Sequence, residues 1–191
     1  LSDADGMAHI SMPVGSYDVN VEHENFLPHS FQYRIGRPEG NEYRPFVRVV
    51  LHPKCSTDQI KVNLVWNESP TDLDLYAVTP FTKVWHDQPV CENTRCHLGQ
   101  DARRGYGPES ITFERLSREQ HGRHLHEGRT SNLRIYVHNY SEECDLSESG
   151  AVLTIMGEKG IIHEIEVPTV GTGEFWDVCS IDMRHLQVQE V

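Results

Sequence analysis

Two aspartates, Asp72 and Asp74, lie two residues apart in the stretch Thr-Asp-Leu-Asp-Leu-Tyr. A strand rises about 3.3 Å per residue and alternates its faces, so their side chains would lie roughly 6.6 Å apart on one face. Two carboxylates that close repel each other, so a cation, backbone N–H donors or water must compensate their charge. The pair is therefore the first candidate for a metal site.

Two readings of this acidic pair stay open. Calcium takes six to eight oxygen ligands, and Asp101, Glu109 and Asn67 could complete such a shell at one end of a β-sandwich. In the other reading, Asp72 caps the turn after Pro70 and Asp74 accepts hydrogen bonds from a neighbouring loop. The turn role is the more common one for an acidic pair at the start of a strand.

The surrounding pattern predicts β-strands. Ile60, Val62, Leu64 and Trp66 alternate with polar residues, the period of a half-buried strand. No stretch shows a sustained helical period, and turn signals recur at all-β spacing. We therefore predict an antiparallel β-sandwich of about nine strands, Ig-like or jelly-roll-like. Further strands are expected in Phe26–Gly36, Phe46–Leu51, Leu73–Val78, Ser110–Leu116, Leu133–Val137, Ala151–Met156, Ile161–Val167, Phe175–Met183 and Leu186–Val191. Residues 1–25 are expected to form an extended or partly ordered leader, and residues 26–191 a single sandwich domain.

The composition excludes some partners. The net charge of −12 would repel nucleic acid and an anionic membrane surface. No run approaches the roughly 20 apolar residues of a membrane helix, so direct membrane insertion is not expected. The first residues lack the basic and apolar regions of a signal peptide, and we expect a domain from a longer or processed chain.

Cysteine usage points to an oxidising compartment. Cys91 and Cys96 bracket the polar stretch Glu-Asn-Thr-Arg, and we predict a disulfide between them because an unpaired thiol gains little in such a loop. The alternative is five reduced, mostly buried thiols in a cytosolic protein. Asn139-Tyr140-Ser141 is an N-glycosylation sequon, a weak additional sign of secretion.

Other residues offer less specific chemistry. His121, His124 and His126 resemble a metal tract, but their polar surroundings favour a solvated loop over a zinc site. Trp66 and Trp176 lie in expected strands and are assigned to the core. Trp85, at the start of a loop, is the candidate aromatic contact for a ligand. No Gly-x-Ser-x-Gly nucleophile motif is present.

Five short motifs in order resemble the YfaP-like domains, a family of secreted and surface-associated bacterial β-sandwich modules. They are Val62–Asn67 with Thr71–Pro80, Gly105–Thr112, Tyr136–Ser141, Ser149–Ile155 and Phe175–Asp182. Tyr76 stands where that family usually has histidine. The resemblance implies a β-sandwich with a non-catalytic accessory or binding role.

We therefore expect a non-enzymatic extracellular recognition or adhesion module that binds a protein or glycan. Its ligand would bind loops at one end of the sandwich, near Trp85–Cys96 and Gly105–Glu109, with contacts from Trp85 and Tyr106 and with Ca²⁺ stiffening those loops. The alternatives are a carbohydrate-binding accessory domain of a larger enzyme and a metal-dependent hydrolase that uses Asp72, Asp74 and the histidines. The sequence does not predict an oligomeric state.

Overall fold

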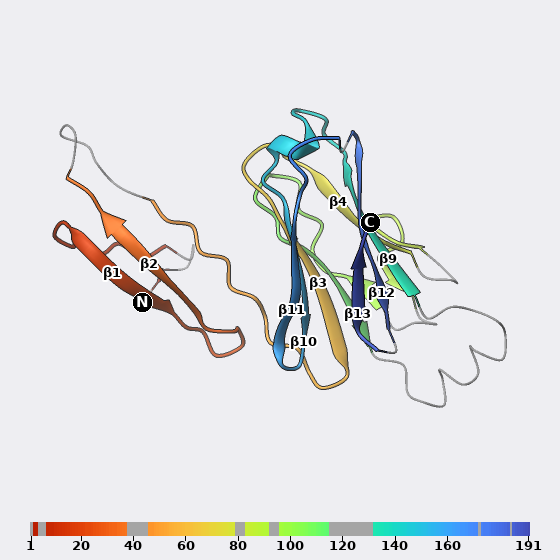
Figure 1. The fold of residues 1–191 in the computed structure, drawn as a ribbon, viewed down its shortest axis with the longest axis horizontal. Coiled ribbons are helices and arrows are strands. Elements are labelled where there is room, and N and C mark those ends of the chain that lie inside the picture. The colour runs from red at the N-terminus through yellow and green to blue at the C-terminus, as the bar shows by residue number, and fades with distance from the viewer. Residues whose placement is uncertain are drawn as a thin grey trace. The chain divides into compact units, whose positions relative to one another are not determined.

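The structure, a computed structural model, is all-β (Figure 1). It describes residues 2–3, 7–37, 46–78, 83–91, 96–114, 132–171, 173–183 and 185–191. In that part of the chain, every regular element is a β-strand except one 3₁₀ turn at Leu146–Glu148. No helix among these residues is long and apolar enough to span a bilayer. The predicted all-β class is confirmed.

The N-terminal part of the chain, Leu1–Lys54, is a compact unit by itself. Strands β1 (Gly15–Val21) and β2 (His29–Ile35) pair there as an antiparallel hairpin. The register places Val19 opposite Phe31, on the face that both strands fill with apolar residues. Alternation of apolar and polar residues thus specifies the hairpin.

This division of the chain differs from the prediction of a leader over 1–25 and one sandwich over 26–191. β1 falls inside the expected leader, because Tyr17, Val19 and Val21 have the strand period although polar residues separate them. Residues 46–51 contain no strand, despite their β-branched run. Strand propensity depends on a partner strand, and the structure provides none for this segment.

The second unit, Cys55–Val191, is the sandwich. Its larger sheet has six strands in the order β11-β10-β3-β8-β7-β6. Their bounds are β3 (Gln59–Val65), β6 (Val90–Cys91), β7 (Cys96–Leu98), β8 (Glu109–Glu114), β10 (Val152–Gly157) and β11 (Gly160–Glu166). Strands β10 and β11, both expected from the sequence, pair as an antiparallel hairpin.

The second sheet has five strands in the order β13-β12-β9-β4-β5. Their bounds are β4 (Leu73–Val78), β5 (Lys83–Val84), β9 (Asn132–Asn139), β12 (Phe175–Asp182) and β13 (Gln187–Glu190). The two sheets form two layers (Figure 1). The strands outnumber the nine predicted, because β5, β6 and β7 are too short to show a sequence period.

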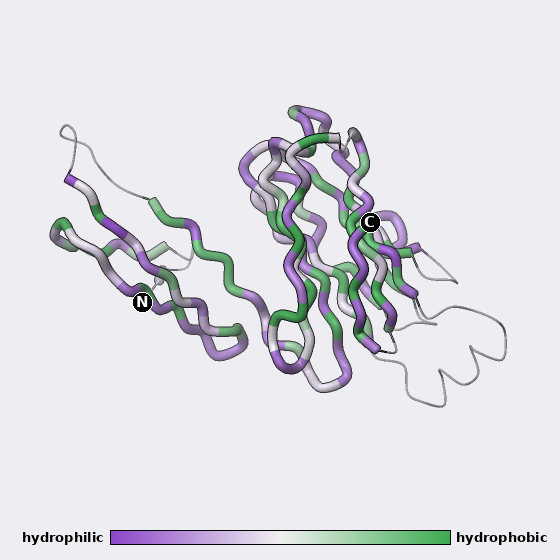
Figure 2. Tube along the Cα trace, in the orientation of Figure 1, coloured by the Kyte–Doolittle hydropathy of each residue, from purple (hydrophilic) through white to green (hydrophobic). Residues whose placement is uncertain are grey.

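The core lies between the two sheets. It contains Trp66 and Trp176, as predicted, with Leu73, Leu75 and Phe113. Apolar and polar residues alternate along the strands of the sandwich (Figure 2). Burial of the inward side chains on both sheets provides the main favourable free energy of folding.

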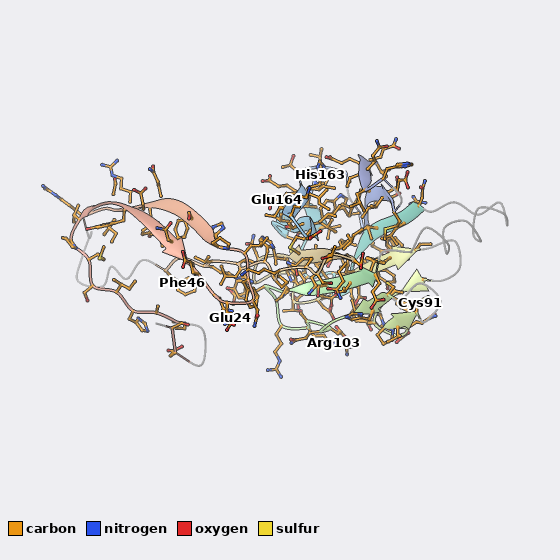
Figure 3. The ribbon with its side chains drawn as sticks, turned by 90° about the horizontal axis from the view of Figure 1, so that it is seen from below. Glu24, Phe46, Cys91, Arg103, His163 and Glu164 are labelled. Carbon is orange, nitrogen blue, oxygen red and sulfur yellow. The ribbon has the colours of Figure 1, made fainter. Side chains whose placement is uncertain are left out.

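The predicted Cys91–Cys96 disulfide is absent: both thiols are free, as are the other three cysteines. Both cysteines are buried on paired strands, β6 and β7, rather than in a polar loop. Figure 3 shows Cys91 and His163 toward opposite edges of the six-stranded sheet. Burial raises the pKa of the Cys96 thiol, which keeps it protonated.

A left-handed turn joins the loops at one end of the sandwich. Gly105, Tyr106 and Gly107 have φ of 70°, 65° and 67°. Gly105 donates its N–H to the Thr71 carbonyl at 2.7 Å, and Tyr106 donates to the Asn67 carbonyl at 2.8 Å. The loop before β8 is thereby tied to the turn before β4.

Replacing Gly105 by alanine should destabilise the sandwich by at least about 3 kcal/mol. The new Cβ would lie 2.2 Å from the Glu68 carbonyl oxygen, at a φ that disfavours L-residues. Urea unfolding measures the loss. Gly171→Ala is the matched control, because its φ is +82° but nothing lies within 4 Å of the added Cβ. It should cost only about 1–2 kcal/mol. Equal losses would contradict the tight contact at Gly105.

Candidate cation site

The four carboxylates predicted from the sequence meet at one end of the sandwich. Asp72, Asp74, Asp101 and Glu109 each offer one oxygen, and these oxygens all lie within 4.8 Å of one another. They come from the start of β4, the loop before β8 and the first residue of β8. The tertiary structure therefore brings residues from both sheets into one acidic cluster.

Strand β4 sets the direction of the first two carboxylates. Leu73 and Leu75 enter the core, so Asp74 points to the opposite face. Asp72 precedes the strand, where its N–H donates to Ser141 Oγ at 3.2 Å and its carbonyl accepts the Ser141 N–H at 3.3 Å. The pair is thus held by both the strand and the loop after β9.

Glu109 closes the inner side of the cluster. Its side chain is only 1% exposed, and its Oε2 accepts the Leu75 N–H at 2.8 Å. Its Oε1 accepts the Ala102 N–H at 3.1 Å. Burial raises the pKa of this carboxyl to about 8, although both N–H donors oppose the shift. A cation would favour its charged form.

Three buried oxygens of the cluster accept no hydrogen bond: Asp72 Oδ1, Asp74 Oδ2 and Asp101 Oδ1. A buried acceptor without a partner is costly, and such groups are rare in folded proteins. One oxygen on each of three neighbouring aspartates is therefore available to a ligand. The arrangement fits a cation that supplies the missing interaction.

The negative charges of the clustered carboxylates also repel one another. Burial, followed by the neighbouring Asp74 and Asp101, raises the pKa of Asp72 to about 6. Burial raises the pKa of Asp74 as well, while the imidazole of His86 acts against that shift. Without a cation, the folded protein therefore holds these carboxylates at an energetic cost.

Two basic side chains flank the cluster without filling it. His86 Nδ1 lies 3.1 Å from Asp74 Oδ1. Arg103 donates from Nε and Nη2 to Asp101 Oδ2, at 2.9 and 2.6 Å. Each contact uses one oxygen of an aspartate and leaves the other, Asp74 Oδ2 or Asp101 Oδ1, without a hydrogen bond.

For Asp72, the turn reading of the acidic pair finds little support in the geometry. Asp72 Oδ1 accepts no hydrogen bond, so it does not cap the turn after Pro70. That turn is held instead by Trp66 Nε1, which donates to the Pro70 carbonyl at 2.8 Å. The Thr71 N–H donates to Glu143 Oε2 at 3.0 Å. Asp72 is thus left for another role, whereas Asp74 does meet a neighbouring turn through His86, as that reading expects.

The predicted aromatic contacts have partners within the chain. Trp85 is half-buried, stacks on Tyr76 and carries the Lys83 ammonium 3.8 Å from its ring centroid. Tyr106 is partly exposed, and its hydroxyl donates to Glu68 Oε2 at 3.2 Å. Neither residue belongs to the acidic cluster, although both border the loops that form it. The histidine tract at 121–126 lies outside the described residues.

Asn139 does not suit the predicted glycosylation. Its side chain is buried, and Nδ2, the atom that would carry a glycan, donates to the Cys144 carbonyl at 2.8 Å. Its Oδ1 accepts the Glu142 N–H at 3.2 Å. Asn139 therefore has a structural role, because its side chain holds the loop after β9.

Asn139→Ala should therefore destabilise the protein by about 2–3 kcal/mol, because it leaves the Cys144 carbonyl and the Glu142 N–H unpaired. Chemical denaturation measures this change. Asn132→Ala, at an exposed position on the same strand, is the control and should change stability by less than about 0.5 kcal/mol. A glycan found on Asn139 by mass spectrometry of folded, secreted protein would contradict this structural role.

The sequence reading missed two histidines and an aromatic cluster. His138 is the register partner of Asp74, and its Nδ1 lies 3.8 Å from Asp74 Oδ2. His86 approaches the same carboxylate from the turn after β5. The outward alternation of Arg134, Tyr136 and His138 was visible, but strand pairing decides which outward residues meet.

Two solved structures share this fold. One is a homologue of the telluride resistance protein TerD from Streptomyces coelicolor A3(2), with a TM-score of 0.52 and 18% identity over 71% of this chain and 89% of that chain. The other is SAV2460, a protein of unknown function, with a TM-score of 0.51 and 17% identity over 71% of this chain and 88% of that chain. No family model matches the sequence. Together with the strand topology, these likenesses show the β-sandwich fold.

Proposed function

We propose that this chain is a non-enzymatic recognition module of a secreted or cell-surface protein, and that calcium stiffens its binding loops. The observation that carries the proposal is the buried cluster of four carboxylates with three unpartnered oxygens. Such a cluster is unfavourable unless a cation or protons neutralise it.

The donor set favours calcium among the common cations. All four side chains offer carboxylate oxygens, which hard cations prefer, and calcium accepts several of them in flexible geometry. Magnesium usually takes one or two carboxylates and keeps most of its water. Zinc and copper sites generally use cysteine or histidine, which the four residues of this cluster do not include.

A cation here would stabilise loops rather than a strand. The cluster joins the start of β4 to the loop before β8, and His86 extends it to the turn after β5. Loops carried by a rigid sandwich are the usual place for ligand contacts. The resemblance to the YfaP-like domains supports a secreted, non-catalytic role, with a protein or glycan as the partner.

Calorimetric titration of chelator-treated protein tests the cation site. We expect calcium to bind more tightly than magnesium, and Asp72→Asn to lose calcium binding. Asp87→Asn, at an exposed aspartate beside His86, is the control and should bind calcium as the native protein does. Equal affinity for both cations in the native protein, or calcium binding that survives Asp72→Asn, would contradict the assignment.

The recognition role needs a separate measurement. Calcium-loaded and chelated protein are applied to glycan and peptide arrays, together with the Asp72→Asn variant. We expect ligands whose binding is lost in both the chelated protein and the variant. Binding confined to glycans would favour the alternative, a carbohydrate-binding accessory domain. Catalytic turnover of an array ligand would contradict a non-enzymatic module.

A further inference from the structure

The outer face of the five-stranded sheet carries a cluster of aromatic side chains. We define the aromatic cluster by its members: Tyr76, Trp85, Tyr136, His138, Tyr140 and Phe175. Strand register brings them together, because Tyr76 pairs with Tyr136 and His138 pairs with Phe175. A sheet face that opposes the core is normally polar, so this composition marks an interaction surface.

The rings stack face to face along the sheet. Tyr76 lies between Trp85 and Tyr136, with centroid distances of 5.3 and 4.7 Å and interplanar angles of 23° and 12°. His138 and Phe175 stack at 4.4 Å and 13°. Ring faces inside these stacks are covered, so only the terminal faces can receive a ligand.

One terminal region already holds a cation. The Lys83 ammonium lies 3.8 Å from the Trp85 centroid and 5.0 Å from the Tyr76 centroid. Both distances are within the range of a cation–π interaction. This contact shows that a ring at the end of the cluster can bind a cation.

The end of the cluster at Phe175 is open, and Tyr140 stands beside it, edge-on to His86 as well as to His138. Phe175 is 52% exposed, and one face of its ring lies on His138, so the other face is available to solvent. Tyr140 is 59% exposed and stands edge-on to His138 at 6.1 Å. Two exposed aromatic rings therefore flank one histidine.

The residues next to Phe175 and Tyr140 in the sequence include two glutamates, which favours a cationic ligand. Glu174 precedes Phe175 in the chain, and Glu142 follows Tyr140 by two residues. The arginine on this face, Arg134, is already paired with Asp177, with Nε to Oδ1 at 2.9 Å. The net charge of −12 adds long-range attraction for a basic partner and repels an anionic one.

We propose that the open end of the aromatic cluster, at Phe175 and Tyr140, binds an arginine side chain on a basic segment of a partner protein. Guanidinium fits best because it stacks on aromatic rings and also pairs with carboxylates through its planar donors. Covered ring faces offer little flat area for a sugar. The inference rests on the proposed recognition role, whose partner chemistry it names, and it does not require a metal in the acidic cluster.

Fluorescence anisotropy with a labelled arginine–glycine repeat peptide tests this proposal. The titration is run at about 0.15 M salt, where charges farther apart than about 8 Å are screened. Glutamine–glycine and lysine–glycine peptides of equal length are the comparison probes. We expect the arginine peptide to bind most tightly and the glutamine peptide not to bind.

Variants distinguish stacking from general attraction to an acidic protein. Phe175→Ala and Phe175→Leu should each weaken arginine-peptide binding about tenfold, since leucine retains apolar area but has no ring face. Ile161→Ala, at a similarly exposed position on β11, should bind like the native protein. Native affinity in Phe175→Leu, equal binding of the glutamine peptide, or no binding of the arginine peptide would overturn the proposal.

Each titration is repeated with calcium and with chelator, so the two proposals can fail separately. Loss of calorimetric calcium binding with retained arginine binding would refute the cation site alone. A calcium-binding protein that ignores the arginine peptide would refute the aromatic site alone.

Discussion

Saturating calcium is expected to stabilise the protein by about 2.7 kcal/mol when its concentration is a hundredfold its dissociation constant. For a domain of this size the midpoint of thermal unfolding should rise by roughly 8 °C. The physical reason is that a folded-state cluster of four carboxylates binds the ion, while an unfolded chain does not hold those oxygens together. Calorimetry or fluorescence melting with calcium and with chelator measures this shift.

The Asp72→Asn variant tests whether the calcium-induced stabilisation depends on the acidic cluster. Removing one carboxylate relieves repulsion from Asp74 and Asp101, which help to raise the pKa of Asp72. The metal-free variant should therefore be more stable than the metal-free native protein at neutral pH, by on the order of 1 kcal/mol after solvent screening. The midpoint of its thermal unfolding should also no longer rise with calcium. Asp87→Asn should retain the calcium-induced rise in the unfolding midpoint. If metal-free Asp72→Asn were less stable than the metal-free native protein, the cluster would not be repulsive.

The second large effect is a fall in the stability of the metal-free protein as the pH rises from about 5 to about 8. Folding raises the pKa of Glu109 from 4.5 to about 8, so the folded state holds a proton that the unfolded state has released in this range. The free energy of unfolding then decreases with pH, opposite to the usual behaviour of a paired carboxylate. The upper limit of the loss is about 5 kcal/mol, at about 1.4 kcal/mol per pKa unit.

Urea unfolding of chelated protein across this pH range measures how the free energy of unfolding falls with pH. Asp72, whose pKa is raised to about 6, contributes to that fall below about pH 6. Saturating calcium should flatten the profile, because it favours the ionised carboxylates that high pH produces. Glu109→Gln should also reduce the slope, while losing about 1–3 kcal/mol because its amide nitrogen cannot accept an N–H. Stability that rises with pH in the metal-free protein would refute the buried, neutral Glu109.

The acidic pair illustrates how far sequence reasoning could go. Period-2 alternation through β4 correctly placed Asp74 on the face opposite Leu73 and Leu75. Asp101 and Glu109 were predicted to complete a calcium shell, and the structure brings both to the pair. The sequence could not decide between a turn-capping role and a cation site, because that choice depends on which carboxylate oxygens lack hydrogen-bond donors.

The errors have a common cause. Cys91 and Cys96 look like loop residues because β6 and β7 are too short for a period, and their burial depends on the neighbouring β8. Asn139 looks like a surface sequon because the burial of its amide depends on the loop that follows. Residues 46–51 look like a strand because β-propensity is local, whereas pairing is not.

The sequence by itself determined the all-β class, most of the longer strands and the residues that enter the core. These follow from local alternation, which specifies the buried face whatever the strand order. Tertiary structure alone decided that four carboxylates, from β4, β8 and the loops before them, share one site, and that the aromatic side chains of β4, β9 and β12 stack into one cluster. Both depend on strand order and register, which pair residues far apart in the chain.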